Sequence, residues 1–253
     1  MFKFKNYLKI IVHICFFIII FNNVEAKKID KFYNDDYVSD YFSGIISLRD
    51  NDYANSYKYL KNLKGLEEKH YVYSQQYILA LVNLNRFKEA ISFAKKIEKK
   101  NISNFEANLI LGIDHLKNKD FIKASNYFLK LNNTPNLPAF QKLITESLLL
   151  WSTLPNKKEK NFKQLTDTIS ARFENIKKIQ NVFISCYYDS KSINNDFKNL
   201  TNTPNLDLSR YYYFHANYLL SKEKVKEANE VLDSALKNYP QNLLLNQLKE
   251  DLN

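Results

Sequence analysis

Apolar residues recur along most of this chain at the spacing of amphipathic helices, and the helices themselves recur every 34 residues. Each step places an aromatic residue directly after a short polar turn, at Tyr53, Phe87 and Phe121. Within a step the apolar positions follow i, i+3, i+4, i+7 spacing, which is typical of a helix with one buried face. In the second step the pattern predicts helices over about 72–83 and 87–99. The sequence therefore predicts antiparallel helix pairs repeated along the chain.

Small residues keep the same step. Gly44 and Gly112 lie two steps apart. We expect them where the two helices of a pair cross, because a residue without Cβ lets two backbones approach. The facing helix should supply another small residue in each pair, and the aromatic residue after each turn should fill the wedge between the two helices. These facing residues are Ser56, Ala90 and Ala124.

Glycine scarcity favours helices over sheets. The 253 residues include three glycines and five prolines. Sandwiches, barrels and nucleotide-binding α/β folds need many tight turns with positive φ, which glycine adopts most easily. The composition therefore predicts an all-α protein.

The repeat pattern weakens after residue 138 and returns near the end. Between 139 and 208 the sequence predicts two degenerate helix pairs, one joining 137–154 to 162–169 and the other joining 173–188 to 193–200. A clearer unit follows over 209–242, with Ala228 in the small position and Pro240 after the second helix. Residues 243–253 are predicted to form an amphipathic helix that caps the array.

These residues resemble the tetratricopeptide repeat (TPR), a 34-residue helix–turn–helix with small residues at positions 8 and 20 and often proline at 32. Counting position 1 from Tyr37, Tyr71 and Phe105 gives three units over 37–138, and Ser209 begins the unit at 209–242. The resemblance implies a right-handed superhelical solenoid of stacked antiparallel helix pairs, with about six units plus the C-terminal capping helix. It also implies a role in binding proteins or peptides.

In the TPR family, the first helices line a groove with positions 2, 5, 9, 12 and 13. The resemblance therefore implies a partner-binding groove whose candidate residues are Tyr41, Arg49, Gln75, Asn83, Lys117, Tyr213 and Asn217. TPR domains that clamp a C-terminal carboxylate use Lys and Asn at positions 5 and 9, and this chain lacks that arrangement. An apolar groove with a few amides and a basic rim favours an amphipathic or extended partner segment. Apolar groove positions such as Leu79 could equally be covered by a neighbouring helix.

The first residues resemble a targeting segment. Residues 1–9 carry three lysines, 10–21 are apolar except for His13, and Val24-Glu25-Ala26 ends the stretch. A charged start, a short apolar core and a V-x-A end predict a secretory signal peptide over 1–26, cleaved after Ala26. The alternative is a retained anchor, for which the apolar run is short. Residues 27–36 would form a linker, and export would place the protein in the periplasm or cell envelope.

Net charge suggests a second class of partner. The formal charge is +10, yet only four of the 37 basic residues are arginines, and the lysines are spread along the chain. Nucleic-acid binding usually depends on arginine clusters, so we expect no nucleic-acid partner. The alternative to peptide binding is a basic peripheral protein that contacts anionic lipid or polymer through surface lysines. The oligomeric state is left open.

Catalytic and metal motifs are not found in the sequence. The three glycines are too far apart for a phosphate-binding loop, and there is no H-E-x-x-H or paired-cysteine pattern. His115 and His215 fall at positions that face inward in the TPR family, and Cys186 lies in an apolar stretch. We therefore expect a non-catalytic protein with no cofactor and no metal; an undetected enzyme is the third and weakest hypothesis.

Overall fold

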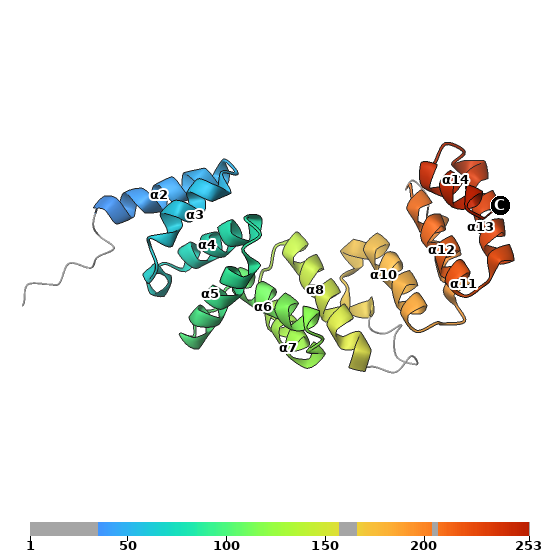
Figure 1. Cartoon of the computed structure of the whole chain (residues 1–253). Helices are drawn as coiled ribbons and strands as arrows, with labels where there is room; N and C mark the ends of the chain where they lie inside the picture. The colour runs from blue at the N-terminus through green and yellow to red at the C-terminus, as the bar shows by residue number, and fades with distance from the viewer. Residues whose placement is uncertain (1–34, 157–165, 204–206, 253) are drawn as a thin grey trace, which may run out of the picture. The chain divides into compact units, whose positions relative to one another are not determined.

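The computed structural model describes residues 35–156, 166–203 and 207–252. These residues form twelve α-helices and no strand, and the helices pack in consecutive pairs (Figure 1). The prediction of an all-α fold built from paired helices is confirmed. The predicted signal peptide, its cleavage site at Ala26 and residues 27–34 of the predicted linker lie outside the described residues.

The chain divides into two compact units between Glu106 and Ala107, within the first turn of α6. In the first unit, α2 (Asp35–Arg49) pairs with α3 (Tyr53–Lys61), and α4 (Tyr71–Asn83) pairs with α5 (Phe87–Lys99). The short 3₁₀ helix η2 (Leu66–Glu68) joins the two pairs. Asp35 and Asp36, the last two residues of the predicted linker, instead form the first turn of α2, where acidic side chains suit the helix dipole.

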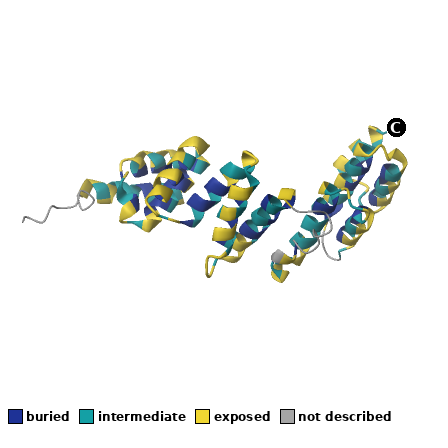
Figure 2. Ribbon diagram, turned by 90° about the horizontal axis from the view of Figure 1, so that it is seen from below, coloured by how far each residue is buried: buried dark blue, intermediate teal, exposed yellow. Residues whose placement is uncertain are grey.

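The second unit contains most of α6 (Phe105–Lys117) and all the helices after it. They are α7 (Phe121–Asn132), α8 (Ala139–Thr153), α10 (Glu174–Tyr187), α11 (Ile193–Thr201), α12 (Ser209–Ser221), α13 (Val225–Asn238) and α14 (Leu243–Glu250). Short 3₁₀ turns lie at Leu154–Asn156, Thr166–Thr168 and Ala171–Phe173. In both units the buried residues lie on the sides of helices that face their neighbours (Figure 2).

The turn between paired helices has the same conformation in four places. Asn51, Asn85, Lys119 and Glu223 adopt positive φ between 58° and 60°, and the second helix of each pair begins two residues later. The first three lie 34 residues apart. At Asn51 and Asn85 an asparagine takes the place that glycine often has, because it tolerates this left-handed conformation better than most residues with a Cβ; Lys119 and Glu223 adopt it without that advantage. The chain therefore makes its turns with few glycines.

Side-chain caps fix where several helices begin. The Asp52 carboxylate accepts a hydrogen bond from the backbone N–H of Asn55 at 3.1 Å, and Asp120 accepts one from Lys123 at 3.3 Å. These bonds satisfy N–H groups that a helix start leaves without partners. The helices they cap start at the predicted aromatic residues, Tyr53 and Phe121.

Gly44 and Gly112 lie at helix crossings, but they face a large residue. A Cβ on Gly44 would lie 2.7 Å from Leu60 Cδ2, and a Cβ on Gly112 would lie 2.5 Å from Phe128 Cε1. The expected neighbours, Ser56, Ala90 and Ala124, are fully buried one helical turn earlier. A helical side chain leans toward its own N-terminus, so the residue that covers a crossing comes later in the sequence than the spacing suggests.

The aromatic residues after the turns are less uniform than expected. Tyr53 and Phe121 are partly buried, whereas Phe87 is 49% exposed. The expectation that this residue fills the wedge between two helices is therefore wrong for Phe87.

The described part of the predicted helix at 162–169 is not α-helical. Residues 162–165 lie outside the described residues, and Thr166–Thr168 form a 3₁₀ turn. The pairing predicted for α8 is instead made with α7. Ile169 packs with Leu150, Leu154 and Ile184. Ile169, which follows this short turn, is therefore the buried apolar side chain that the sequence pattern had placed in a helix.

The terminal unit has a single core. One buried cluster joins its three helices, and no member is more than 2% exposed: Ala216 and Leu219 of α12, Ala228, Leu232 and Ala235 of α13, and Leu245 of α14. Pro240 is exposed and follows the end of α13 by two residues, as is common after a helix end. Helix α14 begins at Leu243, where the capping helix was predicted.

Candidate functional site

One face of α4 carries the residues of the groove predicted for the first unit, together with exposed apolar side chains. Val72 and Leu79 are seven residues apart, which places them on one side of the helix. They are 40% and 46% exposed. Gln75 and Asn83, predicted from the TPR positions, lie on the same face because they are three or four residues from the apolar pair.

Hydrogen bonds connect both edges of this face to neighbouring segments. On one side, the Tyr41 hydroxyl of α2 donates to Gln76 Oε1 at 3.3 Å. On the other side, Gln75 Nε2 donates to Glu106 Oε2 at 3.0 Å. The exposed apolar side chains therefore lie between two polar contacts. We call Val72, Gln75, Leu79 and Asn83, together with Tyr41, the α4 groove.

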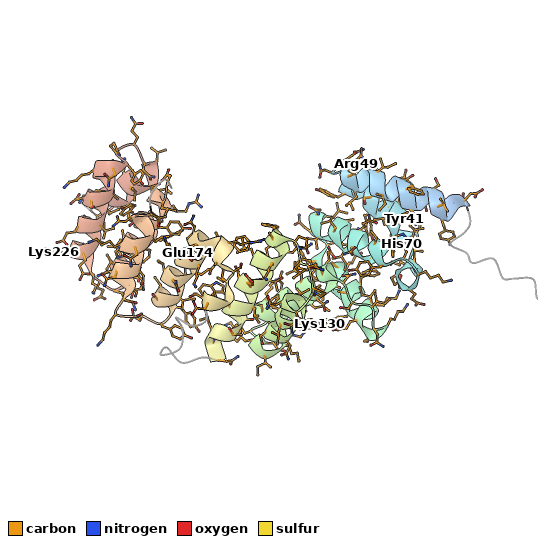
Figure 3. All side chains as sticks on the ribbon, turned by 180° about the vertical axis from the view of Figure 1, so that it is seen from behind. Tyr41, Arg49, His70, Lys130, Glu174 and Lys226 are labelled. Carbon is orange, nitrogen blue, oxygen red and sulfur yellow. The ribbon has the colours of Figure 1, made fainter. Side chains whose placement is uncertain are left out.

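Tyr41 is held in place from two directions. Its ring lies 4.8 Å from the His70 ring, and the two residues are neighbours in Figure 3. Partial burial raises the pKa of Tyr41, so its hydroxyl stays protonated and able to donate. A tyrosine fixed in this way presents a flat apolar ring at little entropic cost to binding.

Arg49 and Asn83 lie at the ends of their helices. Arg49 is exposed in the last turn of α2 and is labelled in Figure 3. Asn83 is exposed at the end of α4, where its Nδ2 donates to the backbone oxygen of Leu79 at 2.8 Å. Asn83 can supply a polar contact at the rim of the α4 groove; Arg49, eight residues after Tyr41, lies on the outward side of α2, away from α4.

The remaining candidates belong to the second unit and do not form one site. Lys117 is exposed at the end of α6, near the 43% exposed Ile113. Tyr213 and Asn217 lie on α12, with α7, α8, α10 and α11 between them and α6 along the chain. Tyr213 and Asn217 are partly buried, and Asn217 Nδ2 donates to the Tyr213 backbone oxygen at 2.9 Å.

A basic hollow in the first unit was not predicted. Its volume is about 570 Å³, and its walls carry Lys64, Lys95, Lys96 and Lys99 around the buried rings of Tyr77 and Phe93, with the acidic Glu89 also in the lining. Lys64 is at least 31 residues from the other three lysines in the sequence. Their position around one hollow could therefore not be read from their spacing along the chain.

Glu67 anchors this region and was also missed. Its side chain is fully buried, accepting hydrogen bonds from the Gly65 backbone N–H at 2.6 Å and from Lys96 Nζ at 2.8 Å. Burial acts to raise the pKa of Glu67, but the hydrogen bonds from Lys96 and the backbone outweigh it and lower the pKa overall. Lys96 is 29 residues from Glu67 in the sequence, so no local pattern indicates this pair.

His215 lies at a second hollow, of about 360 Å³, between α11, α12 and α13. Its Nε2 lies 2.9 Å from Asn194 Oδ1, and its ring stacks 4.3 Å from Phe197. Burial lowers the pKa of His215 to about 4, with the charge of Glu227 opposing the shift. The imidazole is therefore neutral near pH 7. The inward position expected for His215 agrees with its 8% exposure.

Two further observations concern the described residues as a set. Among them, no group of three or more His, Cys, Asp or Glu side chains is arranged to hold a metal ion. Within the same ranges, no helix has both the length and the apolar character that crossing a bilayer requires.

Cys186 is partly buried, and its burial, followed by the charges of Asp196 and Asp189, raises its pKa to about 11.

Comparison with known proteins adds no relative: no protein-family model matches the chain, and no curated protein matches it.

Proposed function

We propose that this chain is a non-catalytic scaffold of the TPR type that binds a protein or peptide segment in the α4 groove. The observation that carries the proposal is the pair of exposed apolar side chains, Val72 and Leu79, between two hydrogen-bonded polar edges. A strip of this kind suits an extended or amphipathic segment, whose apolar side chains cover the strip while its polar groups reach the rim.

The repeat geometry supports the family part of the proposal. Four helix pairs share a turn with positive φ at the same place, and glycine–large residue crossings recur at Gly44 and Gly112. The proposal includes a right-handed superhelix of about six units, with α14 as the cap. It also places the protein in the periplasm or cell envelope, in assembly or maintenance of that envelope, on the basis of residues 1–26.

A selected peptide can test the groove. Peptides that bind the chain are isolated from a random display library, and their affinity is measured by calorimetry. Leu79→Glu should weaken binding at least tenfold, since it puts a charge in the apolar contact, and Tyr41→Ala should weaken it by a similar factor. Ile122→Glu is the matched control, because Ile122 is 67% exposed on α7 of the second unit. If both groove variants bind every selected peptide as tightly as the unmodified chain, the groove is wrongly assigned.

The basic hollow favours a second candidate function, binding of an anionic lipid or polymer. Lys64, Lys95 and Lys99 line the hollow together with Lys96, which already pairs with the buried Glu67, and this excess of positive charge favours a negatively charged ligand. Binding to vesicles with an anionic lipid, or to polyphosphate, should fall steeply as salt is raised, whereas peptide binding at the α4 groove should change little. Replacing Lys64 and Lys99 by glutamine should weaken only the salt-dependent binding.

A further inference from the structure

The outward face of α2 carries a symmetric stripe of exposed residues. Asp35, Val38, Phe42, Ile46 and Arg49 are separated by three, four, four and three residues, so they lie along one side of the helix. All five are exposed, with Val38 at 45%, Phe42 at 59% and Ile46 at 58%. We call these five residues the outer stripe.

The other faces of α2 are already in use. Gly44, nearly opposite Phe42 around the helix, packs against Leu60 of α3. Tyr41, a quarter-turn from Phe42, contacts Gln76 and His70 on the side of α4. The outer stripe thus points away from both neighbours. Single exposed apolar residues are common, but three in a row on one helix are typical of an interaction surface.

The stripe reads the same in both directions about Phe42. When two α2 helices lie antiparallel, Phe42 meets Phe42 of the other copy, and Val38 lies opposite Ile46. Asp35 then lies opposite Arg49, so a negative charge meets a positive one at both ends. This is the self-complementarity that a two-fold contact between identical chains requires.

We propose that two copies of this chain pair through antiparallel α2 helices, about a two-fold axis that passes near Phe42. A parallel partner would set Asp35 beside Asp35 and lose both charge contacts. An anionic membrane surface suits the stripe less well, because Asp35, Asp36 and Asp40 on α2 would be repelled by it. The area is that of one helix against another, below the roughly 1,200 Å² of standard interfaces, so we expect a dissociation constant of about 10–100 µM.

Sedimentation equilibrium of the full chain, from about 5 to about 200 µM, tests the pairing directly. The N-terminus of the purified protein is read by mass spectrometry, so that any processing is known. Phe42→Glu should leave a monomer throughout this range, because it places two like charges on the axis. Ile122→Glu, at a similarly exposed site on α7, should leave the dimer unchanged. Circular dichroism shows whether each variant folds.

Charge reversal tests the antiparallel register, which other modes of contact do not share. Asp35→Arg alone and Arg49→Asp alone should each weaken pairing about tenfold, because each sets like charges opposite one another twice per dimer. The double variant should recover the original affinity, and so should an equimolar mixture of the two single variants. Phe42, at the centre of the outer stripe, carries the decisive test.

Several outcomes would overturn the proposal. A chain that is monomeric at about 200 µM does not pair through this surface. A dimer that survives Phe42→Glu pairs elsewhere. A dimer that is weakened by the single charge variants but is not restored by the double variant has a different register. Binding to vesicles that is lost with Phe42→Glu, in a monomeric chain, would assign the outer stripe to a membrane instead.

Discussion

The crossing of α6 over α7 allows a quantitative test of how the repeats pack. A methyl group on Gly112 would lie 2.5 Å from Phe128 Cε1 and 2.9 Å from Phe128 Cζ. Ordinary carbon–carbon contacts are about 3.5–4.0 Å, so the overlap is about 1 Å. The Phe128 ring is fully buried. Overpacking of this kind costs about 1–3 kcal/mol, partly offset by the better helix propensity of alanine, about 1 kcal/mol.

At the equivalent positions of the second repeat, the large and the small residue are on the opposite helices. Thirty-four residues before Gly112 and Phe128, the chain has Ile78 and Ala94, both buried. The large side chain is then on the first helix and the small one on the second, the reverse of the arrangement at Gly112. Because the repeats share a geometry, moving the second pair into the third repeat should preserve the filled volume.

We therefore expect Gly112→Ala to lower the free energy of unfolding by up to about 2 kcal/mol, and Phe128→Ala to lower it by about 3–5 kcal/mol. Gly112→Ile alone should cost more than Gly112→Ala. The double variant Gly112→Ile/Phe128→Ala should be more stable than the sum of its single changes by about 1–3 kcal/mol. Urea unfolding followed by far-ultraviolet circular dichroism, with linear extrapolation, measures each value. Additivity within about 0.5 kcal/mol would refute the packing argument.

Three more predictions follow from individual buried groups. Ser56→Ala should raise the free energy of unfolding by about 1 kcal/mol, because the buried Ser56 hydroxyl has no hydrogen-bond partner among the described residues; a lower urea midpoint would contradict this. The pKa of Cys186, raised to about 11, should make its alkylation by iodoacetamide at pH 8 about 100-fold slower in the native chain than in urea; equal rates would show an exposed thiol. Burial lowers the pKa of His215 to about 4, so the unfolded chain takes up this proton first as pH falls. The stability of the unmodified chain relative to His215→Gln should therefore fall between about pH 6.5 and pH 4, by at most about 3 kcal/mol, and parallel pH profiles of the two proteins would count against it.

Much of the helical architecture could be predicted because the repeat is encoded locally. A polar turn precedes each of three helices, and each helix begins at the aromatic residue that follows its turn: Tyr53, Phe87 and Phe121. The neighbour of Gly112 could not be predicted from spacing alone, since it depends on the direction in which the Phe128 side chain leans.

The candidate site was less predictable because tertiary contacts define it. Tyr41 and Gln75 were predicted from their repeat positions, yet their partners Gln76 and Glu106 are 35 and 31 residues away. Spacing within one helix does not identify such partners. The burial of Glu67 likewise depends on a lysine 29 residues later, so its short segment resembles an ordinary polar loop.

Trp151 is the one tryptophan of the chain, and it joins α8 to α10. Its Nε1 donates to Gln180 Oε1 at 2.6 Å, and its ring lies edge-on to Tyr187 with the centroids 6.5 Å apart. The wavelength of its fluorescence emission therefore depends on whether α8 and α10 remain docked. No added label is needed to measure it. Thermal unfolding followed by tryptophan fluorescence would therefore show whether the irregular middle of the chain unfolds before the regular repeats.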